Sequence, residues 1–173
     1  MVVRVLMAGC LALALSGCVS DGTNADFATV SQQLGPPKAG QSRLVMMRQK
    51  GVVGVLVGWD AKLDGVPLPS VKNGTYVYAD LPAGNHMLSA SEIMFPGETN
   101  VKISTAPGKT YFFLMQISER GQQLMGAQMA GGLVGYAVGA AVTSDSKNPG
   151  PYVFQPVDEG RARSMIAELS LAQ

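Results

Sequence analysis

The sequence predicts a mainly β protein, folded as an antiparallel β-sandwich of the immunoglobulin- or prealbumin-like kind. From residue 42 onward, short apolar runs alternate with turn pairs such as Asp64-Gly65, Asn73-Gly74 and Pro107-Gly108. In several of these runs apolar residues recur at every second position, the period of a strand with one buried face. This pattern is typical of an antiparallel sandwich or a small barrel. We expect one β domain over residues 42–173 that includes a glycine-rich segment, 121–142, and a C-terminal amphipathic helix, 158–171.

Two runs predict strands that are buried on both faces. Residues 43–48 and 110–117 are almost continuously apolar, so no face is left for solvent. Strands of this kind lie inside a sheet, and we expect 110–117 to be the innermost one. Fully burying a large apolar side chain stabilises a fold by about 1.5–3 kcal/mol, so this strand can supply a large share of the core.

Prolines mark the predicted sheet edges. Residues 66–68 follow the Asp64-Gly65 turn and contain Pro67, and residues 151–157 begin and end near Pro151 and Pro156. Proline cannot donate a ladder hydrogen bond, so both strands belong at edges. Residues 75–81 and 100–106 alternate apolar and polar positions and predict strands with one inward face.

The last predicted element is a helix over residues 158–171. Asp158 can accept hydrogen bonds from the first free backbone N–H groups, and Glu159 places a favourable charge in the first turn. Ala162, Met165, Ile166 and Leu169 form one apolar stripe at helical spacing. We expect this stripe to lie on a sheet or to cover an edge.

The segment between residues 124 and 142 carries no charge, and Gly131, Gly135 and Gly139 recur in it every fourth residue, with Ala127 continuing the row. On a helix this spacing places them on one face, the pattern of closely packed helices. Three interpretations stay open: a helix or helical hairpin against the domain, or a mobile loop; insertion into or onto lipid; and self-association through the glycine face. A full membrane span is the least favoured, because the segment is short and weakly apolar.

The amino terminus has the layout of a secretory signal peptide. Arg4 precedes an apolar run that starts at Val5 and closes with Leu15-Ser16-Gly17-Cys18. This ending resembles the lipobox of bacterial lipoproteins. The resemblance implies cleavage between Gly17 and Cys18, removal of residues 1–17, and lipidation of Cys18, with palmitate among the acyl chains.

Residues 18–41 are small and polar and end near Gly35-Pro36-Pro37, so we expect a flexible tether. Val19 stands where an Asp would retain a lipoprotein at the inner membrane. The resemblance therefore implies a protein of the bacterial cell envelope, anchored in the outer membrane on its periplasmic face.

A second resemblance covers about residues 35–120. Five short stretches follow one another in a characteristic order. They are Gly35-Pro36-Pro37, the Leu63-Asp64-Gly65 turn, Asn73-Gly74-Thr75-Tyr76, the stretch from Asp80 to His86, and Pro107-Gly108-Lys109-Thr110-Tyr111. In this order and spacing they are similar to a family of bacterial lipoproteins, DUF2846, a domain of unknown function. The resemblance implies fold and location and carries no catalytic residues.

No catalytic or metal-binding constellation is visible. The sequence lacks a phosphate loop, zinc-ligand spacing and a nucleophile elbow. His86 is the single histidine and follows a turn, and Asp60, Asp64 and Asp80 sit at turns or strand ends, so we interpret all four as structural. Loss of Cys10 with the signal peptide and lipidation of Cys18 leave no free thiol. We therefore predict no enzyme activity, no cofactor and no metal.

Two functions are compatible with the sequence. The first is a non-catalytic, lipid-anchored envelope lipoprotein whose β domain contacts an envelope protein or a second copy of the chain. The alternative is an envelope binding module for a small ligand or glycan beside Trp59, Tyr76 and Tyr78, or a protein that self-associates and inserts into membranes through the glycine row. Loss of Arg4 with the signal peptide balances the charges, so nucleic acid is not an expected partner.

Overall fold

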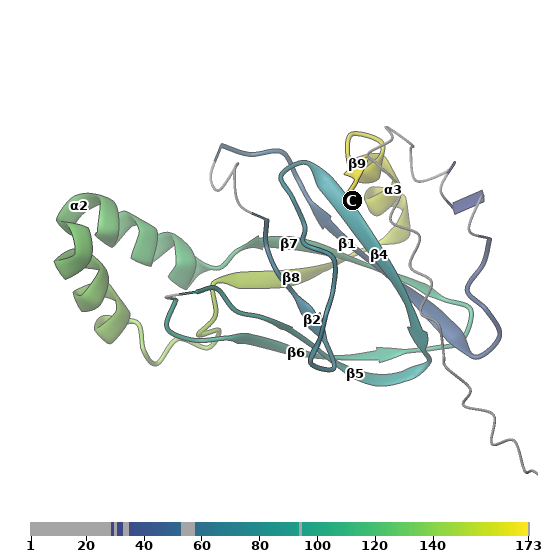
Figure 1. Cartoon of the computed structure of the whole chain (residues 1–173), viewed down its shortest axis with the longest axis horizontal. Helices are drawn as coiled ribbons and strands as arrows, with labels where there is room; N and C mark the ends of the chain where they lie inside the picture. Colours follow the sequence, from purple (N-terminus) through teal and green to yellow (C-terminus); the bar gives the residue numbers. More distant parts are fainter. Residues whose placement is uncertain (1–28, 30, 33–34, 53–57, 94, 173) are drawn as a thin grey trace, which may run out of the picture.

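The structure is a computed structural model of the whole chain, and it describes residues 29, 31–32, 35–52, 58–93 and 95–172. Within these residues the protein is mainly β, with two sheets and two helices, as the sequence predicts. The two sheets form a body, one helix covers that body, and the other projects from one end of it (Figure 1).

The larger sheet has five strands in the order β8-β7-β1-β4-β9. Their bounds are β1 Gln41–Arg48, β4 Thr75–Pro82, β7 Thr110–Ile117, β8 Tyr152–Val157 and β9 Ser170–Leu171. Both doubly apolar strands are interior, as predicted, but the innermost one is β1 and not β7, which lies between β1 and the edge strand β8. The proline-containing β8 is at an edge, which confirms that prediction too.

The smaller sheet has four strands in the order β3-β2-β5-β6. They are β2 Lys62–Leu63, β3 Val66–Pro67, β5 Gly84–Ala90 and β6 Thr99–Thr105. Asp64 and Gly65 form the β2–β3 turn, both with positive φ, and β3 with Pro67 is the predicted edge.

The expectation of antiparallel pairing throughout is wrong for two strand pairs. β1 pairs with β7 in parallel, Arg43 beside Thr110, and β4 pairs with β9 in parallel, Thr75 beside Ser170. Between β1 and β7 the chain enters the smaller sheet twice, first as β2 and β3 and then as β5 and β6, and it forms β4 of the larger sheet in between. It then re-enters the larger sheet from the end where β1 begins. Parallel neighbours need such a crossover connection.

One hydrophobic cluster joins the two sheets. It contains Leu44 and Met46 of β1 and Phe113 and Met115 of β7, which meet residues of the smaller sheet such as Leu88. The predicted inward residues of β6, Val101 and Ile103, pack against the same cluster.

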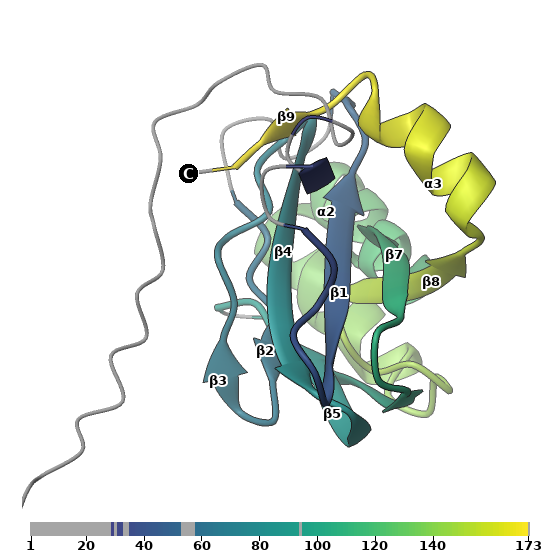
Figure 2. The same ribbon diagram turned by 90° about the vertical axis from the view of Figure 1, so that its right-hand side faces the viewer.

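A second cluster lies on the other face of the larger sheet, beneath helix α3 (Glu159–Ile166). Along β1 and β7 the residues of this cluster alternate with those that lie between the sheets. They are Val45, Met47, Phe112 and Leu114, and they share the cluster with residues of α3. The predicted stripe supplies Ala162, Ile166 and Leu169, with Met165 at its border. Figure 2 shows α3 on the outside of the larger sheet.

The C-terminal helix is shorter than predicted. It ends at Ile166, not residue 171, and residues 170–171 form strand β9. The backbone there pairs with β4, because Ser170 N–H donates to the Gly74 carbonyl and Ala172 N–H to that of Tyr76. These two hydrogen bonds satisfy backbone carbonyls along the edge of β4, which another helical turn would leave without these partners.

Candidate functional site

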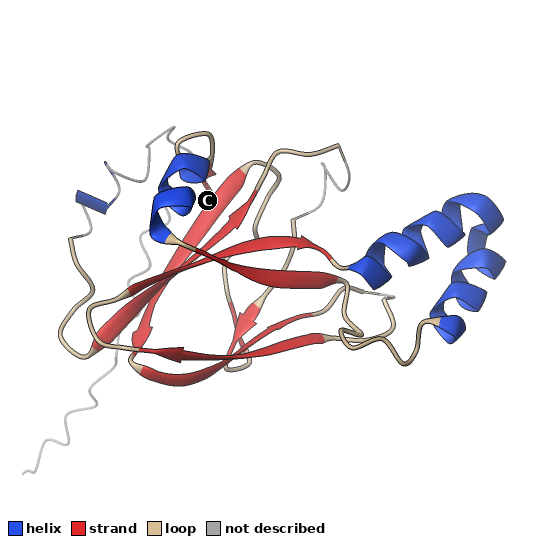
Figure 3. Ribbon diagram, turned by 180° about the vertical axis from the view of Figure 1, so that it is seen from behind, coloured by secondary structure: helices blue, strands red, loops and turns tan. Residues whose placement is uncertain are grey.

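The most distinctive feature is helix α2 (Glu119–Val142), which projects from the end of the body where β7 finishes (Figures 1 and 3). It reverses direction at Gly132, whose φ of 59° and ψ of −144° are not helical. Side chains disfavour this backbone region, which glycine reaches at little cost. We call α2 the hairpin, residues 119–131 its first arm and residues 133–142 its second arm. The segment is thus a helical hairpin, but it projects from the domain, whereas the first interpretation expected it to pack against the domain. Insertion into lipid and self-association stay predictions.

Small residues line the contact between the two arms. A Cβ atom on Gly135 would lie 2.2 Å from the Ala127 carbonyl oxygen, and one on Gly139 would lie 3.1 Å from the Ala127 Cβ atom. Beside Gly131 there is open space. Because the helix reverses, Ala127 faces Gly135 and Gly139 from the other arm instead of continuing their row. Of the predicted row, Gly135 and Gly139 therefore pack within the hairpin, whereas Gly131 packs against neither arm.

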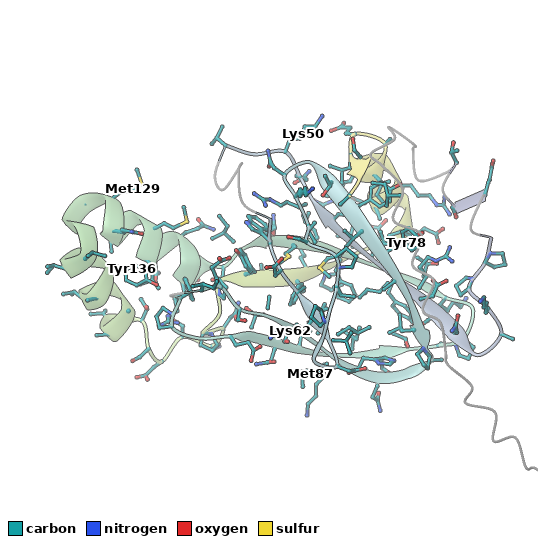
Figure 4. All side chains as sticks on the ribbon, viewed as in Figure 1. Lys50, Lys62, Tyr78, Met87, Met129 and Tyr136 are labelled. Carbon is teal, nitrogen blue, oxygen red and sulfur yellow. The ribbon has the colours of Figure 1, made fainter. Side chains whose placement is uncertain are left out.

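Large apolar side chains cover the outside of the hairpin. Its most exposed ones, with their exposed fractions, are Met129 88%, Val142 79%, Leu133 76%, Val134 75% and Val138 59%. Met129 points away from the hairpin, whereas Tyr136 lies between the arms (Figure 4). Among the described helices α2 is the one long and apolar enough, by length and composition, to cross a membrane. The reversal at Gly132 leaves each arm shorter than the roughly 20 residues that a span needs.

A buried arginine fixes the base of the hairpin. Arg120 is 5% exposed, and its guanidinium donates to the Thr143 hydroxyl at 3.0 Å and to the Ala140 carbonyl at 3.3 Å. It also donates to the backbone carbonyls of Pro96 and Pro149 in the loops beneath. One side chain in the first turn thus holds the end of the second arm and two loops of the body.

The first turn of the hairpin is capped by the body as well. The Ser118 hydroxyl accepts a hydrogen bond from Gly121 N–H at 2.9 Å and donates to the Gly150 carbonyl at 2.7 Å. Only Arg120, Gly121 and Leu124 of α2 are buried. The hairpin is therefore firmly attached at its base and exposed beyond it.

A second polar constellation lies next to this base. The buried Arg48 guanidinium stacks 3.7 Å from the centre of the Trp59 ring, and Trp59 stacks on Tyr152 at 4.8 Å. The Tyr152 hydroxyl donates to the Glu92 carboxylate. Burial lowers the pKa of Arg48 and raises that of Tyr152. A positive charge over an aromatic face is attracted by the ring's quadrupole, most strongly when desolvated.

A cleft of about 400 Å³ opens beside this stack. Arg48 and Trp59 contribute to its wall, together with Asn73, Gln116 of β7 and Gln122 of the hairpin. Of the three aromatic residues proposed for a ligand site, Trp59 lines the cleft and is 8% exposed. The other two lie elsewhere: Tyr76 is buried beneath α3, and Tyr78 borders the same cluster, with Arg43 over its ring.

His86 and Asp64 form an ion pair on the smaller sheet. His86 Nδ1 lies 2.6 Å from the Asp64 carboxylate and Nε2 lies 2.8 Å from the Pro82 carbonyl, so both ring nitrogens face acceptors. The hydrogen bond to Asp64 raises the pKa of His86, and the same bond lowers the pKa of Asp64. Asp64 also accepts from Met87 N–H. The pair thus ties the β2–β3 turn to β5, the structural role predicted for both residues.

A further ion pair, between Arg43 and Asp80, lies where the tether joins the body. Arg43 and Asp80 are directly opposite on β1 and β4 and form two hydrogen bonds, of 2.6 and 2.8 Å. Arg43 also donates to the Gly35 carbonyl, which attaches the last residues of the tether to the body. The hydrogen bond to Asp80 raises the pKa of Arg43.

The remaining predicted site residues, Gly17 and Cys18, lie outside the described residues, as does the signal peptide, 1–17.

The roles of Arg48, Arg120 and the Arg43–Asp80 pair were not predicted from the sequence. A signal was available for Arg48, since it directly follows an apolar run. Within the described ranges, no group of three or more His, Cys, Asp or Glu side chains is placed to hold a metal ion.

One of two comparisons with known proteins found a match. A search of curated proteins found no match. The family model described as protein of unknown function (DUF2846) matches residues 38–130, more than half of the chain. The match covers the body from the start of β1 through β7 and the first arm of the hairpin. The chain belongs to the DUF2846 family.

Proposed function

We propose that this protein is a lipid-anchored lipoprotein of the bacterial cell envelope, held in the outer membrane by Cys18. Its body would be a non-catalytic interaction domain with the immunoglobulin- or prealbumin-like sandwich as its fold. The observation that carries the proposal is the exposed apolar hairpin, which the body holds away from its own surface through Arg120 and Ser118. A domain in free solution gains nothing from such a projection, whereas one that works beside a membrane or an envelope partner does.

The amino-terminal sequence supports the anchor independently. Leu15-Ser16-Gly17-Cys18 follows an apolar run of signal-peptide length. The residues before Gly35, 19–34, reach at most about 55 Å when extended, which is ample for a body to work near its anchoring membrane. The attachment of Gly35 to Arg43 sets the point at which this tether joins the body.

Mass spectrometry of the mature amino terminus tests the anchor. The full chain is expressed in a double-membraned bacterium, and its membranes are separated on a density gradient. We expect an acylated Cys18 as the first residue and recovery with the outer membrane. Cys18→Ala should accumulate as a precursor that keeps residues 1–17. Cys10→Ala, the matched control within the same signal peptide, should behave as the native chain. An unmodified first residue contradicts the proposal.

The cleft beside Trp59 favours a second candidate function, binding of a small ligand or glycan. Its wall offers an aromatic edge, a buried guanidinium and the amides of Asn73, Gln116 and Gln122. Sugars are bound by such combinations of flat apolar surface and planar amide groups. Since Trp59 is the single tryptophan, its fluorescence reports on the cleft alone. Titration with soluble peptidoglycan fragments should give a saturable change that Gln116→Ala weakens, and an unchanged spectrum rules these ligands out.

A further inference from the structure

We infer that the tip of the α2 hairpin inserts into one leaflet of a lipid membrane, so that the partner of this surface is lipid. The inference deepens the proposed function and rests on it for one point, that the chain is anchored to the same membrane. Everything else comes from the hairpin itself: where its apolar side chains lie, how long its arms are and where its flanking charges begin.

The distribution of apolar residues around the hairpin favours lipid over a protein groove. A helix that docks on a protein presents one apolar stripe and keeps a polar face for water. In the hairpin, exposed apolar side chains follow directly on one another at Leu133 and Val134 and recur on both arms. No residue from 121 to 144 is charged. Between residues 124 and 142 the one strongly polar side chain is Gln128, which is exposed on the first arm. A helix with so little polar surface is suited to an apolar environment on most of its sides.

The dimensions of the hairpin match one leaflet. At 1.5 Å per residue, the first arm, residues 119–131, is about 20 Å long, and half the hydrocarbon core of a bilayer is about 15 Å. The first charged residues on either side are Glu119 and Arg120 at the start of the first arm and Asp145 and Lys147 after the second. With the tip in the hydrocarbon, these charges remain at the level of the headgroups or above it.

The tether can bring anchor and hairpin to one membrane. β1 and β7 are parallel, so the tether joins the body at the end opposite to the hairpin (Figure 1). The eight-residue β1 spans about 27 Å. The part of the tether before Gly35, residues 19–34, reaches up to about 55 Å when extended, so the body can lie along the membrane while both ends touch it.

A second copy of the chain is a less suitable occupant. Helices associate in membranes through small residues that let their backbones approach. In the hairpin that surface is already taken, because Gly135 and Gly139 contact Ala127 and Leu124 of the first arm. The side chains left outside are the large ones, and these suit the irregular surface of acyl chains.

Depth-dependent fluorescence quenching tests the inference. The full lipidated chain is placed in vesicles of equimolar phosphatidylethanolamine and phosphatidylglycerol, with a fluorophore on Val134→Cys. A label on Lys102→Cys, on an exposed position of β6, is the control. Nitroxides deep in the acyl chains should remove most of the fluorescence at position 134 and leave that at position 102 nearly unchanged. A position-134 label that only water-soluble quenchers reach overturns the inference.

Substitutions near the tip sharpen the test. Leu133→Glu in the labelled protein should abolish quenching by deep nitroxides, because a carboxylate in hydrocarbon is strongly disfavoured. Val52→Glu, at an exposed apolar position of the body, should leave quenching unchanged. Efficient crosslinking between Val134→Cys copies without lipid quenching would identify a second copy as the occupant and overturn the inference.

The mass of the mature amino terminus, measured on the same sample, keeps the two proposals apart. An acylated Cys18 with an unquenched position 134 overturns the insertion alone. An unmodified first residue with a quenched position 134 overturns the lipid anchor alone.

Discussion

The body and the hairpin are packed in opposite ways. In the body, large apolar side chains such as Leu44, Met46 and Leu88 fill the space between the sheets and are almost fully buried. In the hairpin, Gly135 and Gly139 occupy the interior of the contact while Met129 and Leu133 face outward. Both regions are apolar in sequence, so composition alone does not separate them.

The difference indicates different surroundings. The body gains its stability by removing large side chains from water, at about 25 cal/mol per Å² of apolar area. The hairpin leaves its large side chains outside and gains close backbone contact instead, as helices do in membranes. Its stability in water therefore depends on its base, where Arg120 and Ser118 join it to the body.

The largest expected effect contrasts two leucines. Leu88→Ala in the inter-sheet cluster should lower the free energy of unfolding by about 2–5 kcal/mol, because it leaves a cavity in a fully buried site. Leu133→Ala at the exposed tip should change it by less than about 0.5 kcal/mol. Urea denaturation followed by Trp59 fluorescence measures both, and equal losses would break the contrast between the regions.

The next effect concerns the joint between the regions. Arg120→Met removes four hydrogen-bond donations to part-buried acceptors, which should lower the free energy of unfolding by about 1.5–3 kcal/mol. Hydrogen exchange should accelerate first in the second arm. Arg163→Met is the matched control, since its ion pair with Glu159 is exposed and worth about 0–1 kcal/mol. Unaltered exchange in Arg120→Met would show that the hairpin is held by other contacts.

Two glycines of one row should respond differently. Gly135→Ala drives a methyl group against the Ala127 carbonyl and should destabilise the arm contact by about 1–3 kcal/mol. Gly131→Ala enters open space and should be neutral or stabilise the helix by up to about 1 kcal/mol. Hydrogen exchange of residues 119–142 reports on the arms, and calorimetry should show an unchanged body in both variants. Similar exchange in the two variants would mean that the arms do not pack through Gly135.

The smallest effect is a pH dependence confined to the body. The raised pKa of His86 gives stability that is complete below the unfolded pKa of about 6.5 and is lost as the pH rises through the folded value. The lowered pKa of Asp64 gives stability present above about 3.8 and lost as the pH falls through the folded value. NMR titration of the single histidine should show its raised pKa, which Asp64→Asn should return toward 6.5. A normal value in the native chain would contradict the pair.

Much of the body could be predicted because burial leaves a period in the sequence. The doubly apolar runs became β1 and β7, prolines marked the β3 and β8 edges, and a helical stripe marked α3. The direction of pairing could not be predicted, since a period of two is the same for parallel and antiparallel neighbours. Strand β9 is too short to show a period and depends on the free edge of β4.

The hairpin was predictable in composition and not in geometry. Adjacent glycines at 131 and 132 are a turn signal, yet uniform apolarity on both sides hides where the chain reverses. The role of Arg120 depends on loops from distant parts of the sequence, around Pro96 and Pro149. The Arg43–Asp80 pair was hidden for the same reason, because it requires the register of β1 and β4.

The central claim is that the body folds by itself and carries the hairpin as an appendage. Replacing residues 124–142 with a short Gly/Ser linker and melting the protein in a calorimeter tests it most directly. We predict a single cooperative transition within a few degrees of that of the native chain, because α2 has only Arg120, Gly121 and Leu124 buried. Loss of the cooperative transition would show that the hairpin is part of the core and would contradict the claim.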